Sequence, residues 1–306
     1  MGISLVIAVT DGNWFDMLRR KPDLDEVNFW APSAKNFRAL QPGGLFLFKL
    51  HAPHNFIVGG GIFTHATALP CSLAWEAFRE ANGAHSMDEM RARIIHYRRT
   101  DPDDREDFKI GCRILTCPFF LDESDWLPVP ASWSPQIVQF KTYNTDETEG
   151  LLLWETVQQW LDQTRFTDRG ENQTRYGKPR LIRPRLGQRA FRVIVGDNYQ
   201  RRCAVTQERT FPALEAAHIR PYNKGGGHEE KNGLLLRRDI HRLFDTGYVT
   251  VTPDLHFEVS RRIKDDYENG REYYKLDGQL ILAPKETEKK PDPSALTWHN
   301  ENCYLG

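Results

Sequence analysis

The sequence predicts an α+β protein with a β-rich N-terminal domain and a C-terminal domain of short strands and helices. Its 306 residues are about twice the roughly 150 of a typical domain. Apolar runs of strand length, such as Leu45–Leu50 (LFLFKL), lie mainly in the first half. A stretch rich in Gly, Pro, Asn and Arg, Arg165–Gln188, separates the halves. We therefore place the first domain at 1–145, a connecting helix and basic linker at 146–187, and the second domain at 188–306.

In the N-terminal domain, β-rich apolar runs that end at turn residues, such as Asp11-Gly12, mark the strands. Strands are expected at Ser4–Thr10, Leu45–Leu50, Phe56–Thr67, Lys109–Leu121 and Ile137–Tyr143. Helices are expected at Trp14–Arg20, Ser72–Asn82 and Ser86–Tyr97, with Ser72 as one cap and Ser86 with Glu89 as a capping box. The three glycines Gly59–Gly61 predict a bulge or a close backbone approach.

In the rest of the chain, apolar residues at helical spacing predict the connecting helix Leu151–Asp162 and a second helix, Gln188–Tyr199. Short strands are expected around Cys203 and at Leu214–Ile219 and Leu234–Leu236. A helix is then expected at Asp239–Phe244, followed by a hairpin of Tyr248–Thr252 and His256–Ser260.

Composition and cysteine content restrict the class of protein. The net charge is -1, so any surface for nucleic acid must be a local patch. The five cysteines are odd in number and lack C-x-x-C spacing, which argues against a disulfide framework and against a cysteine zinc knuckle. No run of 18 apolar residues is present, and the N-terminal run lacks a basic leader. A cytoplasmic protein with no membrane partner is expected.

The segment Leu214–Val251 carries four residues suited to phosphodiester hydrolysis, in the order strand, glycine-rich loop, strand, helix. His218 ends the first strand, and an imidazole that titrates near neutral pH suits a general base. His241 on the helix suits a metal ligand, and Asp245 follows on the same helical face. Asn232 can tie the loop to the strand by side-chain hydrogen bonds. Each would alone be an ordinary structural residue, and His228 is interpreted as part of the loop.

The runs A-H-I-x-P around His218 and N-G-L-L-L…H-x-L-F-D from Asn232 resemble the HNH endonucleases, in particular the branch found in bacterial restriction enzymes. The resemblance spans roughly residues 188–300 and includes Arg201–Thr206. It implies a ββα-metal fold and a divalent cation, with Mg²⁺ expected first and Mn²⁺ or another transition metal as alternatives. In such a site His218, Asn232 and His241 are the catalytic residues, with His241 and Asp245 on the metal.

Two positions depart from the family pattern. Many HNH enzymes place Asp or His just before the first histidine as a metal ligand, and here that residue is Ala217. The paired cysteines of a zinc ribbon are also missing, since their positions hold Arg237 and Ile240. The metal is therefore expected to rest on His241 plus another group such as Asp245.

The N-terminal domain contains Asn28–Ser33 (NFWAPS), then Pro42–Leu50 and Ile57–Phe63. This order of elements resembles the PUA superfamily, more particularly the EVE-like and ASCH-like domains, which are similar to the SRA fold. The resemblance implies an aromatic pocket that holds a flipped, modified base. The candidate pocket residues are Trp30, Ser33, Phe48, His51, Asn55 and Trp75. The competing interpretation is that these aromatic residues belong to the core.

Together these features predict a modification-dependent, type IV-like restriction endonuclease that binds double-stranded DNA carrying a 5-substituted cytosine. The alternatives are an HNH toxin or homing-type nuclease that ignores modification, and a degenerate HNH DNA-binding module, for which Ala217 is the argument. From Arg165 to Arg202 there are eleven Lys or Arg against three Asp or Glu, and Arg180, Arg183 and Arg185 are expected to contact the DNA backbone. Cutting both strands with one active site per chain favours a homodimer.

Overall fold

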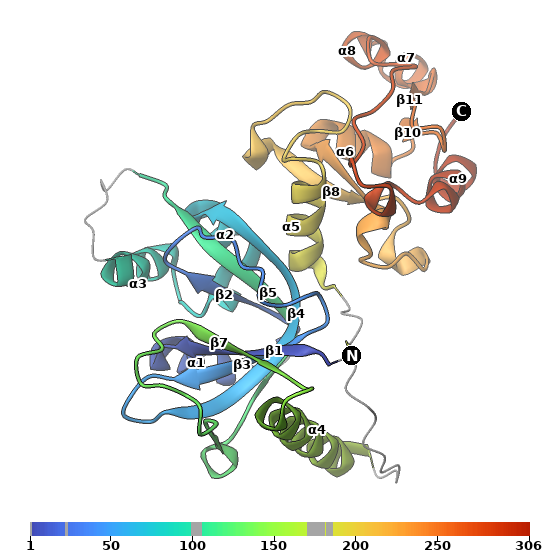
Figure 1. Ribbon diagram of the computed structural model, residues 1–306. Helices are drawn as coiled ribbons and strands as arrows, with labels where there is room; N and C mark the ends of the chain where they lie inside the picture. Colours follow the sequence, from blue (N-terminus) through green and yellow to red (C-terminus); the bar gives the residue numbers. More distant parts are fainter. Residues whose placement is uncertain (1, 22–23, 99–105, 170–180, 182–185) are drawn as a thin grey trace. The chain divides into compact units, whose positions relative to one another are not determined.

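The computed structural model describes residues 2–21, 24–98, 106–169, 181 and 186–306 (Figure 1). The chain divides into two compact units, Met1–Pro184 and Arg185–Gly306. Each contains both strands and helices, which confirms the predicted α+β class. The helix expected as a connector, α4 (Thr148–Arg169), belongs to the first unit.

The described residues of the first unit form one seven-stranded sheet in the order β2-β5-β4-β3-β1-β7, with β6 paired to β4. The strands are β1 (Ser4–Thr10), β2 (Glu26–Ala31), β3 (Leu45–Leu50), β4 (Phe56–Pro70), β5 (Lys109–Phe120), β6 (Leu127–Pro128) and β7 (Phe140–Asn144). The pair β1 and β3 is parallel, and the other pairs are antiparallel. Five of these strands match the sequence prediction, whereas β2 and β6 were not predicted.

The glycines of β4 allow two strands to approach closely, as predicted. A Cβ on Gly59 would lie 2.3 Å from the carbonyl oxygen of Phe119 on β5. The register between β4 and β5 shifts between Gly60 and Ile62, which marks an irregularity in the ladder. Only residues without a side chain fit at this crossing.

The helices that follow the early strands are α1 (Gly12–Arg19), α2 (Cys71–Phe78) and α3 (Met87–Arg98). The amide of Glu89 donates to the hydroxyl of Ser86 at 3.1 Å, as the predicted capping box requires. The Glu89 carboxylate accepts in return from the amide of His85 at 2.7 Å. The prediction that Ser72 caps α2 was wrong, because Pro70 precedes that helix and the Ser72 hydroxyl bonds instead to Asp107.

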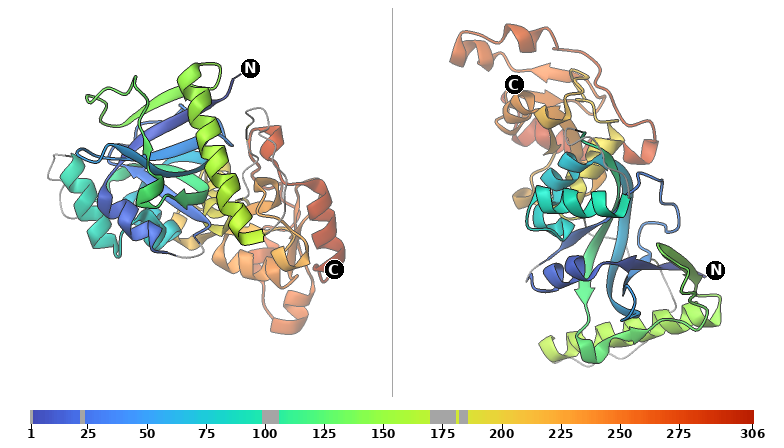
Figure 2. Two further views of the ribbon diagram at one scale, coloured as in Figure 1. Left: turned by 90° about the horizontal axis from the view of Figure 1, so that it is seen from below. Right: turned by 90° about the vertical axis from the view of Figure 1, so that its left-hand side faces the viewer.

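The sheet of the first unit is covered on both faces (Figure 2). On one face the indole of Trp14 on α1 lies edge-on to Phe29 and Phe48, with ring centroids 5.3 and 4.9 Å apart. On the other face α4 packs Leu153 and Trp154 against the apolar side chains of β1 and β3. Because successive residues of a strand point to opposite faces, both faces need the apolar runs seen in the sequence.

The second unit is built around a two-stranded hairpin. It consists of α5 (Gln188–Asn198), β8 (Leu214–His218), β9 (Gly233–Arg237), α6 (Arg238–Asp245), β10 (Val249–Val251), β11 (Phe257–Val259), α7 (Arg262–Tyr267), α8 (Arg271–Tyr274) and α9 (Pro293–Asn302). The order strand, loop, strand, helix in β8, β9 and α6 is the predicted one. The prediction of a strand around Cys203 was wrong. Cys203 lies among turn residues, and its amide donates to the carbonyl of Glu208.

Buried residues of α5, the hairpin and α6 share one hydrophobic core, which includes Phe191, Leu235 and Phe244. The C-terminal helix α9 is fastened to this core by His299, whose ring stacks on Phe244 with centroids 3.7 Å apart. His299 Nδ1 also lies 2.8 Å from the hydroxyl of Thr250. Residues of α6 therefore pack both against the shared core and against α9.

Two further expectations can be compared with the whole described chain. None of the five cysteines, all of which lie in described segments, takes part in a disulfide bond. Among the described helices, none has both the length and the apolar composition needed to cross a membrane.

Candidate active site

His218, at the end of β8, is half-buried and neutral at pH 7. Its ring stacks on Phe191 of α5, with centroids 4.1 Å apart and planes 9° from parallel. Burial in this position, with smaller contributions from His228 and His241, lowers the pKa of His218 to about 4. The sequence-based expectation was an imidazole that titrates near neutral pH, and burial instead moves the pKa of His218 well below it. The neutral ring still keeps a lone pair that can accept a proton, although it is a weaker base than a histidine with the ordinary pKa.

Asn232 fastens the loop between β8 and β9. Its Oδ1 accepts from the amide of Arg220 at 2.9 Å, and its Nδ2 donates to the carbonyls of Arg220 and Gly227, both at 2.9 Å. The loop passes so close that a Cβ on Gly226 would lie 1.8 Å from the carbonyl oxygen of Arg220. The glycine-rich loop is therefore folded tightly over the end of β8.

This loop brings a second imidazole to His218. The Nδ1 atom of His228 lies 2.9 Å from Nε2 of His218, so one ring donates and the other accepts. The ring of Tyr222 also stacks on His228, with centroids 4.9 Å apart. Sequence reasoning missed this contact, since it treated His228 as a loop residue. The glycines that allow the loop to double back were the available signal.

His241, on α6, lies between two carboxylates. Its Nδ1 is 2.8 Å from Oε2 of Glu215, and its Nε2 is 3.4 Å from Oδ2 of Asp245. Burial raises the pKa of Asp245, and the neighbouring His241 and Arg242 only partly offset this rise. Glu215 was not among the candidate residues predicted from the sequence. No local signal in the sequence marks Glu215, because its partner His241 lies 26 residues later in the chain.

The residues around His241 can be tested for their fit to a divalent cation. The segments the structure describes contain no group of three or more His, Cys, Asp or Glu side chains arranged around one point for a metal. Since the two ring nitrogens of His241 face in opposite directions, Glu215 and Asp245 cannot share one cation with it. A cation at Nε2 would have His241 and Asp245 as protein ligands, with water and phosphate oxygens completing the set. Mg²⁺ commonly takes one carboxylate together with waters and phosphate oxygens, whereas an imidazole ligand is more typical of transition metals.

The two departures from the family pattern have structural explanations. Ala217 is fully buried. Because side chains alternate along a strand, it shares a face with Glu215, which lies two residues before it. The carboxylate of Glu215 contacts His241 on α6. At the zinc-ribbon positions, Arg237 forms an ion pair with Asp239 at 2.7 Å, and Ile240 is fully buried. Side-chain packing and an ion pair occupy the places where cysteines would hold zinc.

The candidate base-pocket residues differ in their exposure to solvent. Phe48 is 0% exposed, so it is a core residue with no free face for a base. Trp30 is 9% exposed, and its indole N–H donates to the carbonyl of Asn82 at 2.9 Å. His51 and Asn55 lie together in the exposed turn between β3 and β4.

The remaining candidates are less buried or lie outside the described chain. Ser33 and Trp75 are partly exposed, in the loop after β2 and on α2 respectively. Asn55 accepts a hydrogen bond from the ammonium of Lys49 at 2.8 Å. Arg180, Arg183 and Arg185, expected to contact the DNA backbone, lie outside the described residues.

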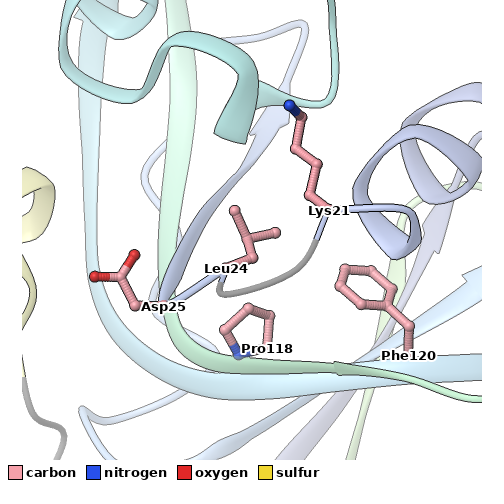
Figure 3. A pocket seen from close by; sticks show the side chains of 5 residues that line it. All are labelled: Lys21, Leu24, Asp25, Pro118 and Phe120. Atoms are coloured by element: carbon pink, nitrogen blue, oxygen red, sulfur yellow. The ribbon is translucent and has the colours of Figure 1, made fainter.

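A hollow of about 430 Å³ in the first unit is lined by other residues (Figure 3). The lining residues are Lys21, Leu24, Asp25, Pro118 and Phe120. The ammonium group of Lys21 is already paired with the carboxylate of Glu80. None of the six candidate base-pocket residues takes part in this hollow.

Comparisons with known proteins agree with the geometry of the second unit. Residues 203–252, which include β8, β9 and α6, match the family model of the HNH endonucleases. A comparison with curated proteins gives no match. Among solved structures, the chain is similar to a protein described as "Modification dependent TagI restriction endonuclease", at 14% identity and a TM-score of 0.29. The match covers 98% of this chain and 81% of that one. At so low a TM-score no property is carried over from that enzyme. Residues 203–252 form an HNH endonuclease domain.

Proposed function

We propose that this protein is a metal-dependent DNA endonuclease that acts on DNA carrying a modified cytosine. The second unit hydrolyses the phosphodiester bond, and the first unit selects the DNA. The observation that carries the proposal is the pair of imidazoles, neutral His218 and carboxylate-flanked His241, within a segment that matches the HNH endonucleases.

In the proposed reaction His218 is the general base. Its neutral imidazole takes a proton from the attacking water, whose oxygen forms the new bond to phosphorus. The bond from phosphorus to the leaving 3′ oxygen breaks, and that oxygen takes a proton from solvent. Asn232 acts indirectly, because it holds the loop that covers the end of β8.

His241 and Asp245 are the proposed ligands of the cation, with Mg²⁺ expected first and Mn²⁺ or another transition metal as alternatives. A divalent cation supplies positive charge that stabilises the phosphate and the leaving oxygen. His241 and Asp245 would hold that cation through an imidazole nitrogen and a carboxylate oxygen, and DNA and water oxygens would supply the remaining ligands.

The turn between β3 and β4, with the aromatic residues around it, is the proposed site that binds the modified base. His54 and Phe56 lie beside Trp126, with ring centroids 6.0 Å from it in both cases. Phe56 is 40% exposed, which is unusual for a large apolar ring. His51 and Asn55, both base-pocket candidates, lie in the same turn. Aromatic faces with polar neighbours suit a base extruded from the helix.

The full-length chain is expected to bind DNA with a modified cytosine more tightly than unmodified DNA, and Phe56→Ala is expected to remove that preference. Base stacking on an aromatic ring contributes about 1–3 kcal/mol, so the loss should be on the order of 5- to 150-fold. The measurement is a titration in EDTA, which prevents cutting, against oligonucleotides that differ at one cytosine.

The matched control is Tyr97→Ala, because Tyr97 on α3 is 41% exposed and lies outside the turn. This variant should keep the preference. The oligonucleotides should carry methyl, hydroxymethyl or glucosylated hydroxymethyl groups. Equal affinity for every oligonucleotide would contradict the reader role and favour a toxin or homing-type nuclease.

A further inference from the structure

Glu215 connects the first strand of the hairpin to the helix that carries His241. Its Oε2 lies 2.8 Å from Nδ1 of His241, and its Oε1 lies 3.0 Å from Nε of Arg238. Both oxygens of one carboxylate are thus engaged by successive turns of α6. The nuclease reaction described above gives Glu215 no part.

This contact favours one of the two neutral forms of the His241 ring. An ionised carboxylate can only accept hydrogen bonds, so the neutral ring must carry its proton on Nδ1 and donate it to Glu215. The lone pair then lies on Nε2, the nitrogen 3.4 Å from Oδ2 of Asp245. Without such an acceptor, the ring is free to carry the proton on Nε2 instead, and that nitrogen could not bind a metal.

We propose that Glu215 is a positioning residue of the metal site, which holds His241 in the Nδ1–H form and so presents Nε2 with Asp245 to a divalent cation. The proposal rests on the function proposed above, in which His241 is a metal ligand. A carboxylate behind a metal-bound histidine fixes the ring and makes the binding nitrogen more basic.

The position of Glu215 also accounts for Ala217. Both residues face α6, but Ala217 is fully buried beneath the helix and has no donor atom. Glu215, two residues earlier, keeps 38% of its side chain exposed and reaches the back of His241. The strand therefore contributes a carboxylate to this site, and it acts through His241 and not by direct contact with the cation.

Anchoring of α6 is the competing explanation for Glu215. The ion pair with Arg238 joins two side chains that are 38% and 59% exposed, and exposed pairs of this kind contribute little to stability. The two roles can be separated because, within the part of the chain that the structure describes, Arg238 is paired with Glu215 and not with His241.

The test compares Glu215→Gln and Glu215→Ala with Arg238→Met in the full-length chain without DNA. Long-range ¹H–¹⁵N spectra of the metal-free protein report which nitrogen of His241 is protonated, and His241→Ala identifies its signals. Wild type and Arg238→Met should show the Nδ1–H form, and Glu215→Ala should lose it. Calorimetry with Mn²⁺ should show affinity about 10–100-fold weaker in both Glu215 variants and undiminished in Arg238→Met.

The outcomes separate this inference from the function on which it rests. If wild type binds Mn²⁺ and both Glu215 variants bind it equally well with His241 still protonated on Nδ1, the positioning role is overturned and the metal site stands. If Arg238→Met weakens Mn²⁺ binding as much as the Glu215 variants do, Glu215 is only an anchor for α6. If wild type binds no Mn²⁺ at His241, the proposed metal site itself fails.

Discussion

Replacing His218 with alanine is expected to lower DNA cleavage by about 10²–10⁴-fold, the usual contribution of a general base. The change removes the neutral imidazole at the end of β8 and leaves His241 and Asp245, the proposed metal ligands on α6, in place. The measurement is the initial rate of plasmid cleavage at pH 7 in Mg²⁺ or Mn²⁺, at matched protein concentration. Because the ring stacks on Phe191, His218→Gln should be tested alongside as a variant of similar volume.

A matched control for this experiment is His256→Ala. His256 is exposed between β10 and β11 and belongs neither to β8 and β9 nor to α6. This variant should cut DNA at the wild-type rate. Both His218 variants should keep the far-ultraviolet circular dichroism spectrum and the DNA affinity of wild type. Cleavage by folded His218→Ala within a few-fold of wild type would show that His218 is not the base.

Replacing His241 with alanine is expected to weaken metal binding and to lower cleavage on the order of 10²-fold or more, because a bound cation supplies several kcal/mol of transition-state stabilisation. His241 presents one ring nitrogen to Asp245, and no other imidazole is paired with that carboxylate in the described segments. The measurements are calorimetry with Mn²⁺ and plasmid cleavage over a range of metal concentrations.

Asp245→Asn tests the second proposed metal ligand in the same calorimetry and cleavage assays. It should weaken Mn²⁺ binding while it leaves the contact between His241 and Glu215 in place. Unchanged affinity in Asp245→Asn would remove Asp245 from the ligand set and leave His241 as a lone protein ligand. Unchanged affinity in His241→Ala would contradict the proposed metal site as a whole.

The hairpin and helix of the second unit were predictable because local signals and family motif agree there. The runs around His218 and Asn232 predicted β8, β9 and α6 to within one or two residues. Asn232 was expected to hydrogen-bond to its loop, and its side chain forms three such bonds, to Arg220 and Gly227.

The contacts between these elements could not be predicted in the same way. Glu215 and His241 are 26 residues apart, and their contact depends on how α6 crosses the strand. The pairing of His218 with His228 depends on the fold of a loop with three successive glycines, which the residue types alone do not determine. Sequence periodicity carries information on faces and lengths, but not on which side chains meet across a fold.

For the base-pocket candidates, the sequence could not distinguish exposed aromatic residues from buried ones. Aromatic residues near turns served as the signal, but the same residue types fill the interior of a sheet that is covered on both faces. Phe48 lies on the inner side of β3 because of the alternation along that strand, and α1 covers it. Strand β2 was not predicted, so the burial of Trp30 within it could not be anticipated.

Cleavage of matched plasmids tests the central proposal most directly. Unmodified plasmid and plasmids with methylated, hydroxymethylated or glucosylated cytosine are each incubated with the wild-type chain in Mg²⁺, Mn²⁺ or EDTA. We expect cleavage of at least one modified plasmid with a divalent cation, little cleavage of the unmodified plasmid, and none of any plasmid in EDTA. Robust cleavage in EDTA would contradict the metal mechanism, and equal cutting of all plasmids would contradict modification dependence. A failure to cut any of them in either metal would favour a degenerate HNH module that only binds DNA.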